Sequence, residues 1–131
     1  MINMKSSNII ESFKYAITGI KDSFEERNIK IQFIVMILVI ITGIIFKIEI
    51  IEWIICFILF TLVISGELFN SAIENAVDFT EKNRNDSERF GIDENARKAK
   101  DISAGAVLVL SIGSAIVGLI IFIPKIMALI L

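Results

Sequence analysis

Three long apolar runs dominate this chain and limit the folds that it can adopt. A helix of about 17–25 apolar residues crosses a hydrocarbon layer about 30 Å thick. Only helices and closed barrels satisfy the backbone inside a bilayer, and these runs lack the alternation of barrel strands. The sequence therefore predicts an all-α integral membrane protein. Its three transmembrane helices are expected at about 29–47, 50–78 and 100–123.

The composition agrees with this prediction and excludes several soluble functions. Of the 131 residues, 55% are hydrophobic, above the roughly 45–50% apolar content of soluble domains. The length fits one domain, 1–131. The net charge of -2 and the lack of a basic stripe indicate no nucleic acid partner. The sequence has no histidine, which excludes histidine-based catalysis and metal ligation, and its single cysteine, Cys56, cannot form an intramolecular disulfide.

Residues 8–27 predict an amphipathic helix that lies on the membrane surface. Charged residues, among them Lys14 and Lys21, fall largely on the face opposite the apolar positions. This pattern is typical of a helix in the bilayer interface. The apolar positions that recur at helical spacing are Ile9, Ile10, Phe13, Ile17, Ile20 and Phe24.

The basic residues predict the orientation. Eleven of the 13 lie at or before residue 30 or between residues 82 and 100, and the other two are Lys47 and Lys125. Because basic residues favour the cytoplasmic side, we expect a multi-pass protein of the cell membrane with a cytoplasmic N-terminus. The hydrophilic stretch 79–99 is then a cytoplasmic loop, and Asp93 is a suitable N-cap for the last helix.

A row of polar side chains interrupts the second apolar run. Glu67, Asn70, Glu74 and Asp78 follow one another at gaps of three, four and four residues. On a helix this spacing keeps them within about 80° of arc. An acid in or beside the hydrocarbon layer is costly and is a functional candidate by default. The row therefore predicts a site for cations, protons or phosphates at the cytoplasmic end of this helix.

Further charged groups are expected at the same membrane surface. Glu25 and Glu26 precede the first span, and Lys100 and Asp101 begin the third. Magnesium prefers oxygen ligands, usually one or two carboxylates with substrate phosphates, and phosphoryl transfer adds a positioned base and a cationic side chain. The residues alone leave two other interpretations open: interhelical hydrogen bonding, and a non-enzymatic cation- or proton-conducting protein. A carrier usually places its acid near the bilayer midplane, whereas these acids gather toward one face, which favours surface chemistry.

The row also carries a resemblance to a known family. The segment 67–78, Glu-Leu-Phe-Asn-Ser-Ala-Ile-Glu-Asn-Ala-Val-Asp, resembles the signature of the prokaryotic diacylglycerol kinase and undecaprenol kinase family. The segment 99–107, Ala-Lys-Asp-Ile-Ser-Ala-Gly-Ala-Val, is similar to a second family signature. Tyr15-Ala-Ile-Thr-Gly19, followed by Glu26-Arg-Asn28, is similar to the family's surface helix and acidic turn.

The resemblance implies a trimeric lipid kinase that transfers phosphate from ATP, with Mg²⁺, to the hydroxyl of undecaprenol or diacylglycerol. The high Ile, Asn and Lys content and the Glu-Arg-Asn turn resemble Gram-positive members of the family, many of which prefer undecaprenol, so the resemblance favours undecaprenol. In this family Glu67 would be the general base and Asn70 would hold the site together. Glu26 and Glu74 would bind the Mg²⁺, with Glu25 an alternative to Glu26. The remaining assignments are nucleotide binding by Tyr15, Lys100 and Asp101, and polar support from Asp78.

Overall fold

The computed structural model describes residues 8–84, 91 and 93–130. Every regular element in these ranges is an α-helix, and three of the helices are long and apolar enough to cross a membrane. This confirms the predicted fold class of three spans preceded by a short N-terminal helix. The helices are α1 (Ile9–Ser23), α2 (Arg27–Ile45), α3 (Ile50–Lys82) and α4 (Glu94–Ile130).

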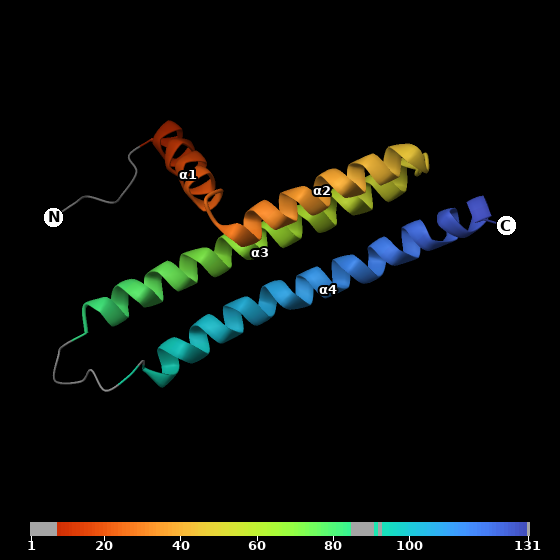
Figure 1. Ribbon diagram of the computed structural model, residues 1–131. Coiled ribbons are helices and arrows are strands. Elements are labelled where there is room, and N and C mark those ends of the chain that lie inside the picture. The colour runs from red at the N-terminus through yellow and green to blue at the C-terminus, as the bar shows by residue number, and fades with distance from the viewer. Residues whose placement is uncertain (1–7, 85–90, 92, 131) are drawn as a thin grey trace.

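The three long helices run side by side, and α3 contacts both of the others (Figure 1). α3 packs most extensively on α4 and less on α2. We call the end of the bundle near α1 and the α3–α4 connection the α1 end. The opposite end, which holds the α2–α3 turn and the end of α4, is the turn end.

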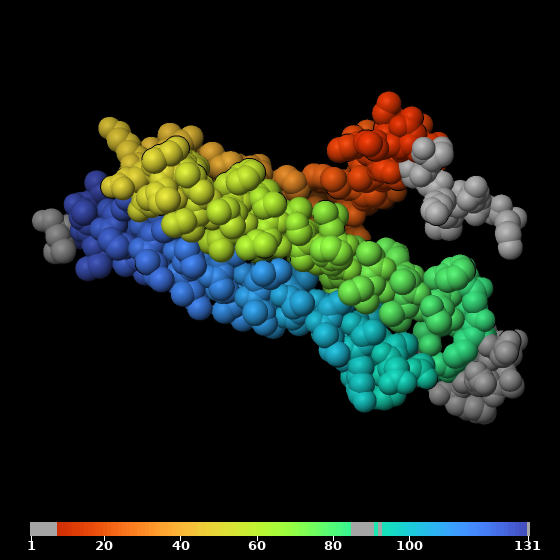
Figure 2. All heavy atoms as spheres, turned by 180° about the vertical axis from the view of Figure 1, so that it is seen from behind, coloured from red at the N-terminus to blue at the C-terminus, as the bar shows by residue number. Residues whose placement is uncertain are grey.

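α1 leaves the bundle at an angle and contributes no buried residue (Figure 2). Asn8 caps it, because the Ile10 backbone N–H donates to Asn8 Oδ1 at 3.4 Å. Its apolar residues, from Ile9 to Phe24, are exposed. This is the surface that an interfacial helix presents to lipid.

Aromatic side chains join the helices at both ends of the bundle. At the α1 end, the Phe33 ring of α2 lies 4.6 Å from that of Phe24 and 5.5 Å from that of Phe60 on α3. At the turn end, the rings of Phe46 and Phe122 lie 6.5 Å apart and connect α2 to α4. α2 is therefore attached near both of its ends.

The turn end combines a close helix contact with an ion pair. A Cβ atom at Gly43 would lie 2.7 Å from the Trp53 ring, so only glycine allows α2 and α3 to approach there. Glu52 accepts a hydrogen bond from the Glu49 backbone N–H at 2.7 Å, and its carboxylate lies 2.9 Å from Lys125 Nζ. These contacts fix α3 against α2 and α4 at this end.

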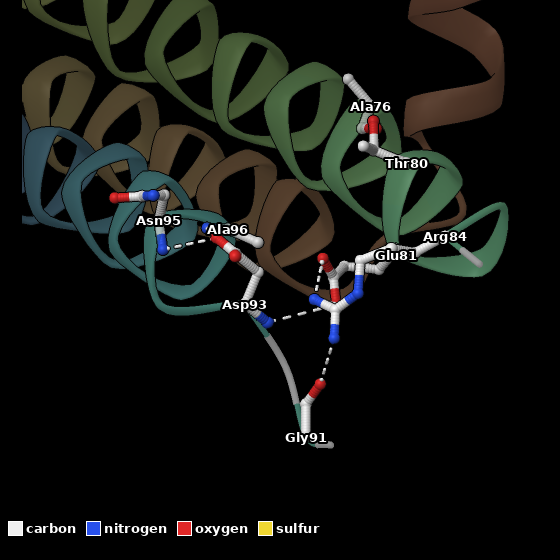
Figure 3. A network of polar contacts seen from close by, with 8 residues as sticks. All are labelled: Ala76, Thr80, Glu81, Arg84, Gly91, Asp93, Asn95 and Ala96. Atoms are coloured by element: carbon white, nitrogen blue, oxygen red, sulfur yellow. Dashed lines mark hydrogen bonds and ion pairs between the residues drawn. The ribbon is translucent and has the colours of Figure 1, made fainter. Parts of the chain in front are cut away.

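The α1 end has its own polar junction between α3 and α4 (Figure 3). The Arg84 guanidinium lies 3.2 Å from Glu81 and donates to the Gly91 carbonyl at 2.9 Å. Asp93 caps α4, as its sequence position predicts, by accepting from the Asn95 backbone N–H at 2.8 Å. Glu81 Oε2 also accepts from the Asp93 backbone N–H. One carboxylate thus links the end of α3 to the start of α4.

The helices extend beyond the apolar runs. α3 continues to Lys82 and α4 begins at Glu94, so both enter the stretch 79–99 that the sequence predicts as a loop. Residues 85–90 and 92 of that stretch lie outside the described residues. α4 also continues through Pro124, although proline has no backbone N–H to donate to the preceding turn.

Candidate active site

The polar row lies on one face of α3, as predicted from its spacing, and runs from the interior of the bundle toward the α1 end. Glu67 is only 4% exposed, and Asn70 is also buried. Glu74 is half-buried and Asp78 is exposed. The row therefore connects a buried carboxylate to the end of the bundle where charged side chains gather.

Asn70 joins the row to α4. The Ser103 hydroxyl of α4 donates to Asn70 Oδ1 at 2.7 Å, and both residues are buried. Asn70 Nδ2 in turn donates to Glu74 Oε1 at 2.9 Å. The Asn70 amide thus connects Ser103 of α4 with Glu74, which lies one turn further along α3.

Glu26 joins the row to the start of α2. It is the residue directly before α2, and its Oε2 accepts a hydrogen bond from the Ser71 hydroxyl at 2.5 Å. Ser71 is buried on α3 between Glu67 and Glu74. Glu25 is exposed at the same turn. Of the two acids that the sequence leaves open at this position, Glu26 is the one that contacts α3.

A groove with a volume of about 270 Å³ reaches Glu67 between α2 and α4. Gln32 of α2 and Glu67 of α3 line this groove together. The groove is lined by Asn28, Ile31, Gln32, Glu67, Val107, Leu108 and Ser111. The groove therefore gives access to a buried acid from between two helices that are long and apolar enough to cross a membrane.

Lys100, Asp78 and Asp101, which the sequence assigns to the site, each form an ion pair at the α1 end. Lys100 Nζ of α4 lies 2.8 Å from Asp78 Oδ1 of α3. Asp101 lies 2.5 Å from Arg97, four residues earlier on the same helix. Both pairs stand near the solvent-accessible end of the polar row. Tyr15, on α1, is 63% exposed and stays outside the buried cluster.

The donor set fits a magnesium ion that arrives with phosphates. Among the described residues, no three acidic or thiol side chains are arranged to hold a metal by themselves. Magnesium, however, commonly takes only one or two protein carboxylates and completes its shell with phosphate oxygens and water. Glu26 accepts a hydrogen bond from Ser71, and Glu74, three residues after Ser71 on α3, accepts one from Asn70. These two carboxylates are the kind of protein ligand that such an ion takes.

Sequence reasoning did not single out Ser71 and Ser103. Ser71 lies four residues after Glu67 and three before Glu74, which is the spacing of the same helix face. Ser103 lies three residues after Lys100 and so faces the same side of α4. Helical spacing from the charged residues is therefore a signal for both serines. Their partners, Glu26 and Asn70, become visible only with the helices docked.

The structure thus places a buried carboxylate at a groove between two long apolar helices, with further acids and a lysine toward the α1 end. Comparison with known proteins gives the class. Residues 14–122 match the family described as prokaryotic diacylglycerol kinase, and the chain belongs to that family. It is a lipid kinase embedded in the membrane.

Two curated relatives are similar over nearly the whole chain. Undecaprenol kinase from Bacillus subtilis is 38% identical over 121 residues, which cover 91% of each chain. Diacylglycerol kinase from Synechocystis sp. is 32% identical over 123 residues, covering 93% of this chain and 66% of the relative. No solved structure matches the chain significantly.

Proposed function

We propose that the protein phosphorylates the hydroxyl of a membrane lipid with ATP and Mg²⁺ and that Glu67 is the general base. The observation that carries this proposal is the burial of Glu67 at a groove between α2 and α4. A hydroxyl that enters sideways from the bilayer meets a carboxylate that water reaches poorly. Such a carboxylate can accept the hydroxyl proton once the hydroxyl comes within hydrogen-bonding distance of it.

The transfer balances with Glu67 as the acceptor of the proton. The lipid oxygen attacks the γ-phosphorus of ATP, a new oxygen–phosphorus bond forms, and the bond to the β-phosphate oxygen breaks. The hydroxyl proton passes to Glu67, and ADP leaves. Two contacts of Asn70 support its role in holding this end of the site together, since it accepts from Ser103 of α4 and donates to Glu74. Gln32 lines the groove beside Glu67. Positioning of this kind is the main demand of phosphoryl transfer.

Glu26 and Glu74 would hold the Mg²⁺, which neutralises phosphate charge when it is bound. Lys100 and Asp101 would contact the nucleotide, with Tyr15 of the surface helix beside it and Asp78 as polar support. The pairing of Lys100 with Asp78 supports this arrangement, because it holds an ammonium group at the open end of the row. A phosphate chain between two acidic side chains requires such cations.

We assign undecaprenol as the preferred substrate and diacylglycerol as the alternative. The relative that matches over 91% of each chain is named an undecaprenol kinase. We further propose a homotrimer in the cell membrane, with the N-terminus, α1 and the α3–α4 connection in the cytoplasm. The exposed apolar residues along α2 and α4 support contacts with lipid or other copies, and the basic residues at the α1 end support the orientation.

The experiment is phosphate transfer from labelled ATP by the purified protein in micelles that contain either lipid. We expect Mg²⁺-dependent labelling of undecaprenol that falls by about 10²- to 10⁴-fold in Glu67→Gln. Glu49→Gln, at the turn end, is the matched control and should retain activity. A folded protein that labels neither lipid would contradict the proposal and favour ion conduction, which needs acids but no ATP.

A further inference from the structure

The Ser103 hydroxyl stands between two acceptors that compete for its single proton. Its oxygen lies 2.7 Å from Asn70 Oδ1 and 2.9 Å from the Lys100 carbonyl oxygen. A serine hydroxyl has one proton to donate and two lone pairs to accept with. It can therefore donate to Asn70, or donate to Lys100 and accept a bond from Asn70 instead. In either arrangement the hydroxyl proton of Ser103 is hydrogen-bonded.

The Asn70 amide has the matching freedom. In the structure its oxygen faces Ser103 and its Nδ2 donates to Glu74 Oε1. The two ends of an amide have nearly the same shape, so rotation by half a turn about the last side-chain bond exchanges oxygen and nitrogen. In the exchanged orientation, Nδ2 donates to Ser103 and the amide oxygen faces Glu74. Two oxygens then face each other, which is favourable only with a cation between them.

We infer that Ser103 is a positioning residue that lets Asn70 turn its amide oxygen toward Glu74, so that the amide becomes a further ligand of the divalent cation. This inference rests on the proposed cation site at Glu74. Without a cation, Asn70 donates to Glu74. With one, the Ser103 hydroxyl rotates and donates to the Lys100 carbonyl oxygen, Asn70 Nδ2 donates to Ser103 Oγ, and the amide and carboxylate oxygens both face the ion. Amide oxygens are good ligands for hard cations.

Burial makes the serine necessary for this exchange. Asn70 and Ser103 are each 7% exposed, so water cannot replace the lost partner freely. In both orientations each polar atom of the Ser103–Asn70 pair keeps a partner. Alanine at 103 would leave one end of the amide unpaired, whereas threonine keeps a hydroxyl on the same carbon. The serine thus acts on the cation through Asn70, with no contact to the ion.

The test measures cation binding directly. Mn²⁺ is titrated into the purified protein in micelles with a non-hydrolysable ATP analogue, and free Mn²⁺ is followed by electron paramagnetic resonance. We expect Ser103→Ala to weaken Mn²⁺ binding about 10- to 100-fold, the usual effect of removing an outer partner of a metal ligand. Ser103→Thr should restore affinity to within a few-fold. Ser114→Ala, a serine further along α4, is the control and should bind as the wild type does.

A second readout follows the amide itself. The side-chain ¹⁵N signal of Asn70 should shift when Mg²⁺ and the analogue are added to the wild type, and should not shift in Ser103→Ala. Wild-type Mn²⁺ affinity in Ser103→Ala, or a loss of thermal stability without a change in affinity, would overturn the inference while the kinase proposal stands. A wild-type protein that labels lipid but binds no Mn²⁺ with the analogue would overturn the inference and the magnesium assignment together.

Discussion

The Lys100 ammonium of α4 lies 2.8 Å from the Asp78 carboxylate of α3, at the solvent-accessible end of the polar row. The two residues are 22 positions apart and meet because α3 and α4 run antiparallel from a junction held by Glu81 and Arg84. Asp78 therefore holds the Lys100 ammonium at the end of the row where we propose that the nucleotide binds.

Replacing Asp78 should weaken nucleotide binding more than it affects folding. In Asp78→Asn the lysine loses its charged partner and is no longer held over the row. We expect the KM for ATP to rise about tenfold, the effect of one charge-assisted hydrogen bond, with kcat nearly unchanged. The pair is solvent-accessible, so thermal stability should hardly change. A large fall in kcat at saturating ATP would contradict this role.

The contact between Ser71 and Glu26 separates Glu26 from its neighbour. Ser71→Ala removes the hydrogen bond that holds the Glu26 carboxylate against α3. Both Ser71→Ala and Glu26→Gln should raise the Mg²⁺ concentration needed for half-maximal activity, by about 10- to 100-fold. Glu25→Gln is the matched control and should not. A stronger effect from Glu25→Gln than from Glu26→Gln would reverse the assignment.

Filling the groove should block the lipid and spare the nucleotide. Leu108 lines the groove that reaches Glu67. Its replacement by tryptophan adds bulk to a space of about 270 Å³, so the KM for the lipid should rise several-fold. Equilibrium binding of a fluorescent ATP analogue should stay the same. Leu119→Trp, exposed on the same helix outside the groove, serves as the comparison. Equal lipid kinetics in the two variants would exclude the groove as the entry path.

Gly43 should tolerate no larger residue. An added Cβ would meet the rigid ring of Trp53 and the Ile48 side chain within 3.0 Å. We expect Gly43→Ala to lower the free energy of unfolding in micelles by about 1–3 kcal/mol. Gly19→Ala, where the new atom meets open space, should be neutral or raise helix stability by up to about 1 kcal/mol. Unfolding by added denaturing detergent measures both, and equal stabilities would refute the clash.

The Glu52–Lys125 pair at the turn end should behave as a coupled unit. Glu52→Gln leaves Lys125 without its partner, and Lys125→Met leaves Glu52 without its own. A half-buried charge without a partner costs more than removal of both charges. Each single variant should therefore be less stable, and the double variant should lose less than the two losses together. Strict additivity in the same unfolding assay would show that the pair contributes nothing.

The fold class could be predicted from the sequence because the hydrocarbon layer accepts only segments whose backbone N–H and C=O groups are paired internally. Three apolar runs admit only helices, and the i, i+3, i+4 spacing of Glu67, Asn70 and Glu74 survives in α3 because no proline or glycine bends that segment. The start of α4 agrees with the Asp93 N-cap that its sequence position predicts, whereas the end of α3 was harder to predict. α3 continues through hydrophilic residues to Lys82, beside a junction of Glu81 and Arg84 with the start of α4 that hydropathy cannot reveal.

The site divides in the same way. Candidate acids follow from their cost in an apolar helix, and Glu67 and Glu74 stand out on this ground. The partners of these groups depend on how the helices dock. Ser103 meets Asn70 across 33 positions, and Ser71 meets Glu26 across 45. Helical spacing from the charged residues places both serines on the faces that carry the site, but it does not reveal that Asn70 and Glu26 are their partners.

Few apolar side chains are buried inside the bundle. Among the described residues they are Ile29, Ile48, Val63, Val107 and Ile121. In water such a chain would lack the burial that offsets the entropy of folding. Surrounding acyl chains must take the place of an interior. The choice of detergent or lipid is therefore part of the folded state of this kinase, and a preparation that strips annular lipid changes the protein as surely as a mutation does.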